Sequence, residues 1–266
     1  MNPQDILHHL DQGKLWAAPI SNATAFDLPA AYARALEVRA LRVARGEAPL
    51  GYKVGFTNRT IWPRYNVFAP IWGTVWDSTL KFCEGASDVR LQATCQPRLE
   101  PEIVFGMKAT PAPEATLQDL YNAIDWVAPG FEVVQTHLPD WKFLPADTVA
   151  DGALHAHLLV GPRLAAETLA SDAAALDHQL TQAHVALSRD GQAVETGVGA
   201  NVLGSPLRAL LHFLETLRAC PGAPDLLPGD VVTTGTWTDA WPVEPGQAWK
   251  AEFSLPGFAL EARFTD

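Results

Sequence analysis

Two glutamates separated by one residue, Glu100 and Glu102, are the most informative side chains of this sequence about its chemistry. They lie in the segment Arg98–Phe105, and in an extended strand residues i and i+2 share a face. Two carboxylates about 7 Å apart at Cα repel each other unless a cation lies between them. Hard divalent ions such as Mg²⁺ take oxygen ligands of this kind, so the pair predicts a metal site. A solvated strand face is the alternative interpretation.

Glu132 is the candidate for a third ligand. It lies in the apolar run Phe131–Val134, and burying a carboxylate without a partner is costly. We therefore expect it at a sheet edge, in an ion pair, or on a metal ion. Together with Glu100 and Glu102 it would provide three carboxylate ligands and leave positions open for substrate and water.

Lys53 is the candidate catalytic base or acid. In an extended Gly51–Thr57 segment its side chain shares a face with Gly51 and Gly55, which leave space around the ammonium group. A lysine beside a metal ion or in an apolar pocket can exchange protons with a substrate. An ordinary surface lysine is the alternative.

Several other polar residues are candidates for the same site. Asp77 follows Trp76 and is a candidate catalytic residue at the rim of the site. Asp147 and Asp151 lie in a polar loop and are candidates for fixing Lys53, with Asp147 as a further candidate catalytic residue, although an aspartate in such a loop is often a turn or cap residue. His155 and His157 have strand-like spacing, but a third soft ligand is missing nearby, which argues against zinc.

A strand ending in small and hydroxyl residues offers a possible anion contact. The run Gly229–Thr236 ends in Thr234, Gly235 and Thr236, whose backbone N–H groups and hydroxyls can face an anion. A strand that simply ends in a turn explains the same run.

The bulk properties exclude several classes of protein. The 266 residues are 48% hydrophobic, which suits one large domain or two closely packed ones. A net charge of −11 argues against nucleic acid or an anionic membrane as the main partner. Three cysteines without a C-x-x-C pair, and the lack of a signal peptide or membrane-spanning run, predict a cytoplasmic location. Serine-hydrolase and nucleotide-binding motifs are missing from the sequence.

The pattern of elements predicts an α+β fold, with a helical N-terminal portion over residues 1–50 and a β-rich body over residues 51–266. Helices are expected at Ala30–Glu47, capped by Asp27, and at Thr116–Trp126, Ala165–Asp177 and Pro206–Ala219. Strands are expected at Gly51–Phe56, Gly73–Trp76, Glu102–Met107, Phe131–Val134, Leu158–Gly161, His184–Arg189, Asp230–Thr236 and Trp249–Leu255.

Taken in order, the segments resemble the 2-keto-4-pentenoate hydratase and 4-oxalocrotonate decarboxylase family of the fumarylacetoacetate hydrolase superfamily. The likeness spans about Leu50 to Phe264 and rests on Gly51–Thr57, Glu100-Pro101-Glu102, Glu132, Asp140-Trp141-Lys142, Asp147–Asp151, Val202-Leu203-Gly204 and Gly229–Thr236. It implies a fumarylacetoacetate hydrolase-like β-rich body, Mg²⁺ or Mn²⁺ on the three glutamates, and an active-site Lys53. It also implies a homo-oligomer, with a sequential pathway enzyme as a candidate partner. Lys142 and His155 fall in segments expected to contact substrate.

The sequence departs from this family after Val149-Ala150-Asp151. The family usually continues Asn-Ala-Ser-Ser-Gly, whereas this chain has Gly152-Ala153-Leu154-His155-Ala156. The run Asn58–Tyr65 and the Trp72/Trp76 pair are also bulkier than usual. These differences predict an unusual or more aromatic substrate.

The leading hypothesis is a metal-dependent lyase that hydrates a 2-hydroxypenta-2,4-dienoate-like acid in aromatic-compound degradation. One alternative is decarboxylation of a 2-oxohexenedioate, which needs the same ion and the same lysine. A second is C–C hydrolysis of an acylpyruvate, with His155 as a candidate base that lacks an assigned partner. A third is a catalytically silent relative that binds metal and an oxo acid.

Overall fold

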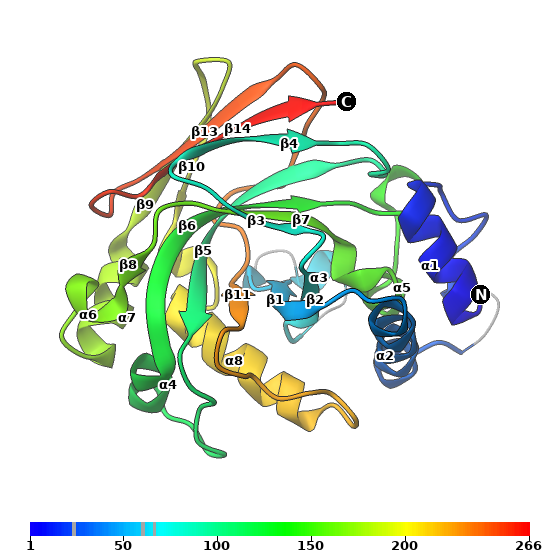
Figure 1. Ribbon diagram of the computed structural model, residues 1–266, viewed down its shortest axis with the longest axis horizontal. Helices are drawn as coiled ribbons and strands as arrows, with labels where there is room; N and C mark the ends of the chain where they lie inside the picture. Colours follow the sequence, from blue (N-terminus) through cyan, green and yellow to red (C-terminus); the bar gives the residue numbers. More distant parts are fainter. Residues whose placement is uncertain (23–24, 60–61, 66–67) are drawn as a thin grey trace.

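A curled, mixed nine-stranded sheet forms the centre of the computed structural model, which describes residues 1–22, 25–59, 62–65 and 68–266 (Figure 1). Thr60 and Ile61 of the bulky run lie outside the described residues. The strand order is β2 (Ile71–Trp76), β1 (Pro49–Gly55), β11 (Val231–Thr233), β5 (Arg98–Met107), β6 (Ile124–Val134), β7 (His155–Val160) and β3 (Leu80–Phe82). Two short strands lie off this path: β12 (Trp241–Pro242) pairs with β5, and β8 (Leu164–Ala165) pairs with β6.

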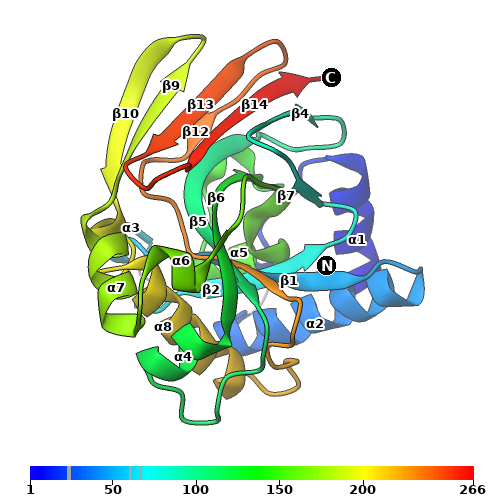
Figure 2. The ribbon, with the colours of Figure 1, turned by 60° about the vertical axis from the view of Figure 1, so that its left-hand side comes forward.

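A second, five-stranded sheet lies beside the first. Its order is β10 (Gln192–Val198), β9 (His184–Arg189), β13 (Ala248–Phe253), β14 (Ala259–Thr265) and β4 (Ala86–Arg90). Figure 2 shows this sheet above the curled one, with the helices α4, α7 and α8 at the opposite end. The sequence analysis did not anticipate β4, β10 and β14.

The helices are α1 (Pro3–Gln12), α2 (Leu28–Ala44), α3 (Trp62–Tyr65), α4 (Leu117–Ala123), α5 (Pro145–Ala150), α6 (Ala166–Leu169), α7 (Ala173–Gln182) and α8 (Pro206–Ala219). Side chains cap the start of five helices, α1, α2, α4, α7 and α8. Asp27 caps α2 as expected, and Ser205 caps α8 by accepting from the N–H of Arg208. The buried face of α8, which includes Phe213, contributes to the main core.

The alternation predicted for Arg98–Phe105 is present in β5. Leu99, Ile103 and Phe105 are buried in the main core between the sheets and α8. Glu100 and Glu102 occupy the other face, which lines the inside of the curl. This division follows from the two-residue period of a strand, and it places both carboxylates away from the apolar core.

Three of the expected elements differ in the structure. The helix expected at Thr116–Trp126 ends at Ala123, and Trp126 lies in β6. The helix expected at Ala165–Asp177 is divided into α6 and α7, because Asp172 starts a new helix by capping the N–H of Ala175. The polar loop expected around Asp147 contains the buried helix α5.

The N-terminal helices lie against the body. Ala31 of α2 is buried in one cluster with Val149 of α5 and Ile71 of β2. The boundary near residue 50 coincides with the start of β1, and the division into two portions stays a prediction. Among the described residues, helices long and apolar enough to cross a membrane are absent.

Candidate metal centre

Strand pairing brings the three predicted ligands together. In the antiparallel pair β5–β6, Glu100 stands opposite Glu132, and Glu102 stands opposite Gly130. One carboxylate oxygen from each of Glu100, Glu102 and Glu132 lies within 4.8 Å of the others. Glu102 and Glu132 are fully buried, and Glu100 is half-buried. The predicted convergence of three acidic side chains is therefore present.

The turn after β11 anchors Glu102. Its Oε2 accepts hydrogen bonds from the backbone N–H groups of Thr234 (2.9 Å) and Gly235 (2.6 Å). Gly235 has φ +95°, and a Cβ there would lie 1.9 Å from Thr57 Oγ1, so only glycine fits. The other oxygen, Oε1, is buried and has no hydrogen-bond partner among the described residues. This leaves one oxygen of Glu102 held by the protein and one available to a ligand.

Lys53 extends from β1 into the same cluster. Its Nζ lies 3.3 Å from Glu132 Oε2, and the side chain is only 2% exposed. A Cβ on Gly55 would lie 3.4 Å from this Nζ, so the glycine leaves room for the ammonium group as the sequence suggested. Burial alone would lower the pKa of Lys53, but the three surrounding glutamates raise it above its ordinary value. The group is therefore an ammonium ion among carboxylates.

Without an added cation, the cluster carries more negative charge than one lysine balances. Burial, reinforced by neighbouring Glu132, raises the pKa of Glu100 to about 7. The same two causes, with Glu100 as a further contributor, raise the pKa of Glu102 well above its ordinary value. The orphaned oxygen of Glu102 and this repulsion both fit a site for a hard divalent cation, since every donor is a carboxylate oxygen.

His155 contacts the third glutamate. Its Nδ1 lies 2.9 Å from Glu132 Oε1, and its Nε2 lies 2.8 Å from Thr79 Oγ1. Burial lowers the pKa of His155 and outweighs the opposing contribution of Glu132. Sequence reasoning placed His155 near the substrate and did not anticipate Thr79, which is 76 residues away along the chain.

A cavity of about 370 Å³ opens onto the cluster. Lys53 and Glu100 line it, together with Gly235 and Thr236 of the turn after β11. Apolar side chains form another part of its lining: Phe56, Ile71, Phe143 and Leu154. Arg98 and Lys142 add positive charge, although Lys142 is highly exposed and pairs with Asp140 at 3.6 Å.

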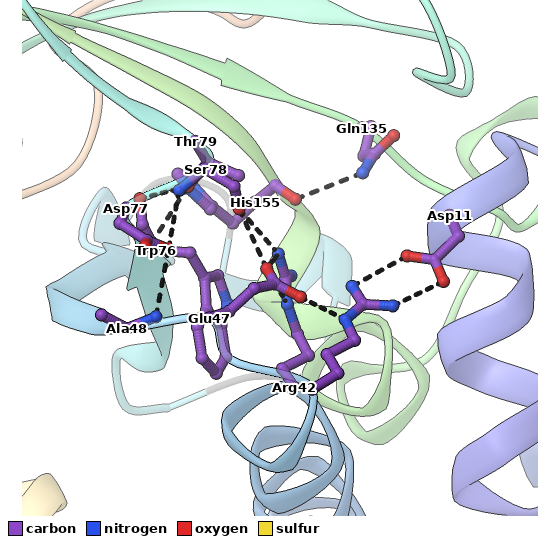
Figure 3. Close-up of polar contacts among 11 residues, drawn as sticks. Asp11, Arg42, Glu47, Ala48, Trp76, Asp77, Ser78, Thr79, Gln135 and His155 are labelled. Carbon is purple, nitrogen blue, oxygen red and sulfur yellow. Dashed lines mark hydrogen bonds and ion pairs between the residues drawn. The ribbon is translucent and has the colours of Figure 1, made fainter.

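The structure does not bring Asp77 and Asp147 to this cavity. Asp77 lies in an exposed turn, where its Oδ1 accepts from the N–H groups of Ala48 (3.1 Å) and Ser78 (2.9 Å) (Figure 3). Asp147 is buried in the first turn of α5 and binds the N–H and hydroxyl of Ser21 at 3.0 and 2.6 Å. Their carboxylates are occupied by turn and cap contacts, so the predicted catalytic roles are corrected to structural ones.

Two further predictions change in detail. Thr234 uses its N–H for Glu102 and its hydroxyl for the carbonyl of Ile103, so it supports the ligand and does not line the cavity. Asp151, considered as a partner for Lys53, instead binds His137 through an Oδ1–Nδ1 contact of 2.6 Å.

Comparison with known proteins identifies the family. Residues 74–264 match the family described as fumarylacetoacetate (FAA) hydrolase C-terminal. The chain is 34% identical over 218 residues to 2-hydroxyhexa-2,4-dienoate hydratase of Comamonas testosteroni, covering 81% of this chain and 78% of that protein. It is 30% identical over 211 residues to 4-oxalocrotonate decarboxylase of a Pseudomonas species, covering 79% and 77%.

A solved structure agrees over nearly the whole chain. The 4-oxalocrotonate decarboxylase from Pseudomonas putida G7, complexed with magnesium and adipate, superposes with a TM-score of 0.85 at 26% identity, covering 99% of this chain and 98% of that one. The chain therefore belongs to the fumarylacetoacetate hydrolase family. The predicted family, the α+β fold and the assignment to a lyase are confirmed.

Proposed function

We propose that this chain is a Mg²⁺-dependent hydro-lyase that adds water to a 2-hydroxypenta-2,4-dienoate-like acid. The observation that carries the proposal is the meeting of Glu100, Glu102 and Glu132 beside buried Lys53, where Lys53 and Glu100 line a cavity. Hydratases among the relatives support the reaction class. The assignment of the metal to these three glutamates and of the proton transfers to Lys53 is part of the same proposal.

The donor set favours magnesium. All three candidate ligands are carboxylates, and Glu102 Oε1 lacks a partner among the described residues. Mg²⁺ takes six oxygen ligands in octahedral geometry, so three carboxylates that each give one oxygen would leave open positions for water and a 2-oxo acid. The magnesium in the solved decarboxylase supports this choice, with Mn²⁺ as the alternative.

The mechanism assigns the proton transfers to Lys53. When bound, the ion supplies a Lewis acid for the 2-oxo and carboxylate oxygens of the substrate. Lys53 Nζ, which lines the cavity and is charged, donates a proton to the terminal carbon of the dienol, and the proton released from the 2-hydroxyl group restores the ammonium, so the product is an α,β-unsaturated 2-oxo acid. Water then adds at the alkene carbon remote from the carbonyl. Gly235 and Thr236 line the same cavity and are proposed substrate contacts.

The apolar lining favours hydration of an uncharged chain end. Leu154 replaces a small hydroxyl residue of the related sequences and lines the cavity with Phe56, Ile71 and Phe143. A distal carboxylate placed against these side chains would lose hydration without gaining hydrogen bonds. We therefore propose a monocarboxylic dienoate with a short apolar tail.

Decarboxylation of a 2-oxohexenedioate is the second candidate. Arg98 and Lys142 also line the cavity, and either cation can face a second carboxylate. The adipate in the solved relative is a dicarboxylate bound by a decarboxylase. C–C hydrolysis has less support, because His155 does not line the cavity and its Nδ1 is occupied by Glu132.

A substrate test separates these reactions. The metal-free enzyme is mixed with 2-hydroxypenta-2,4-dienoate or 2-oxohexenedioate, with and without Mg²⁺, and the products are identified by mass. We expect Mg²⁺-dependent loss of dienol absorbance and a product heavier by one water. Loss of CO₂ from the diacid alone would establish the decarboxylase. Tight binding without a product from either acid would favour the catalytically silent relative. A cytoplasmic location, a homo-oligomer and a sequential pathway partner stay predictions from the sequence.

A further inference from the structure

His155 joins the metal centre to a turn that lies outside the cavity. The residue begins β7, directly after Ala153 (φ 54°) and Leu154 (φ 68°). Two successive left-handed residues that are not glycine are unfavourable, so this backbone persists only because its surroundings hold it. It directs the imidazole away from the cavity lining, into contact with Glu132 on one side and Thr79 on the other. Figure 3 shows His155 beside the turn Trp76–Thr79, whose last residue is Thr79.

The hydrogen bonds fix the orientation of the imidazole. A carboxylate only accepts, so Nδ1 of His155 must carry the hydrogen that it shares with Glu132 Oε1. In the neutral ring, Nε2 then accepts from the Thr79 hydroxyl at 2.8 Å. The same hydroxyl oxygen accepts from the N–H of Trp76 at 3.1 Å, which keeps it in place, and the Trp76 carbonyl, at 3.2 Å, is a more distant acceptor for its single hydrogen. The ring is therefore held at both nitrogens.

Glu132 and Glu102 are anchored in the same way by different partners. In each, one oxygen is taken by protein donors: Oε1 of Glu132 by His155, and Oε2 of Glu102 by two backbone N–H groups. In each, the second oxygen is buried without a hydrogen-bond partner among the described residues, and that of Glu132 faces Lys53 at 3.3 Å. Glu102 thus keeps one oxygen without a protein partner, and the second oxygen of Glu132 has only the Lys53 ammonium group beside it.

We propose that His155, held by Thr79, is a positioning residue that restricts Glu132 to one-oxygen ligation of the metal. This inference rests on the proposed function, because it assumes that the three glutamates hold the ion. Without the imidazole, Glu132 can rotate, turn both oxygens toward the ion or move to Lys53. Such outer contacts typically change metal affinity by about 10- to 100-fold.

The test measures Mn²⁺ binding to the metal-free enzyme by electron paramagnetic resonance, with substrate left out. His155→Leu removes the donor, and His155→Asn keeps an N–H near the position of Nδ1. Thr79→Val removes the hydroxyl at constant shape, and Thr79→Ser keeps it. We expect His155→Leu to weaken Mn²⁺ binding about 10- to 100-fold and Thr79→Val by a smaller factor in the same direction. His155→Asn and Thr79→Ser should stay nearer to the unmodified enzyme.

Activity gives a second readout. The losses in His155→Leu and Thr79→Val should be recovered by raising the Mn²⁺ concentration, because positioning acts on metal occupancy. If His155→Leu fails to fold, Thr79→Val alone decides the question. Binding of Mn²⁺ within twofold of the unmodified enzyme in a folded variant would overturn the inference and leave the proposed function intact. An unmodified enzyme that binds no Mn²⁺ would overturn both.

Discussion

Glu100 and Glu132 stand directly opposite each other on neighbouring antiparallel strands, with their side chains on the same face. Like charges in such a cross-strand pair destabilise a sheet, because the side chains are close together. Here a third carboxylate, Glu102, lies on the same face two residues along β5. The protein supplies one buried ammonium, Lys53, against the three. The arrangement is stable only with protons or a further cation.

Glu102→Gln should abolish metal-dependent turnover. The amide oxygen can still accept from the N–H groups of Thr234 and Gly235, but an NH₂ group would replace the oxygen that lacks a partner. We expect Mn²⁺ affinity to fall by more than the about 10- to 100-fold typical of outer contacts. Isothermal titration calorimetry measures this, and exposed Glu114→Gln is the matched control. Full activity of Glu102→Gln in the presence of a chelator would contradict the metal site.

Lys53→Met should separate chemistry from metal binding. The substitution keeps an unbranched chain of similar length and removes the proton donor. We expect kcat to fall by about 10²- to 10⁴-fold, the usual contribution of general acid–base catalysis. Mn²⁺ affinity should be retained or increased, because a positive charge 3.3 Å from Glu132 is lost. Kinetics and calorimetry on the same preparation check both, with exposed Lys108→Met as the control. A normal kcat would remove Lys53 from the mechanism.

Gly235→Ala should damage the metal site through the backbone. Its left-handed φ of +95° costs an alanine about 1–2 kcal/mol, and the added Cβ would also collide with Thr57 Oγ1. The turn must shift, which moves the N–H that Glu102 accepts at 2.6 Å. Gly246→Ala is the matched control, because Gly246 has a similar φ of +88° but open space around it. Thermal unfolding and Mn²⁺ titration should show a larger loss for Gly235→Ala in both quantities, and equal losses would contradict the argument.

The local part of the site could be predicted from the sequence. The two-residue period of a strand places Glu100 and Glu102 on one face and Leu99 on the other, whatever the rest of the fold does. The small residues around Lys53 similarly indicated space near its ammonium group, and Gly55 provides it.

The long-range part could not be predicted in the same way. The His155–Thr79 contact joins residues 76 apart, and it depends on how β7 and the turn after β2 lie in the folded sheet. Asp147 was placed in the site because it is acidic, but its carboxylate caps a buried helix and binds Ser21. From the sequence alone, an aspartate at this position is equally compatible with a role in the site and with a role as a helix cap. Only its contacts in the folded protein distinguish the two. The edge strand β4 was missed because its partner in the sheet is β14, with which it pairs in parallel over a long separation along the chain.

The stability of the metal-free enzyme should fall as the pH rises from about 6.5 to 8, because below this range the lowered pKa values of His155 and His157 act in the opposite direction. Burial and Glu132 raise the pKa of Glu100 from its ordinary 4.5 to about 7 in the folded state. Between these values the unfolded chain has lost this proton while the folded chain still holds it, so folding becomes less favourable as pH increases. The contribution of the Glu100 proton to stability is complete below about pH 4.5 and is lost once the pH has passed about 7. Glu102, whose pKa is also raised, adds to the loss in the same direction.

A bound divalent ion should reverse this trend, because it favours the charged carboxylates. The gain in Tm on adding Mg²⁺ should therefore increase with pH, since protons compete with the ion at low pH. Scanning calorimetry at four pH values from 5 to 8, with chelator or with Mg²⁺, measures both effects. Glu100→Gln is the control, because it removes one titrating group from the cluster, and it should flatten the pH dependence of the metal-free enzyme. A Mg²⁺-induced gain that is the same at pH 5.5 and pH 8 would show that these carboxyls do not hold the ion.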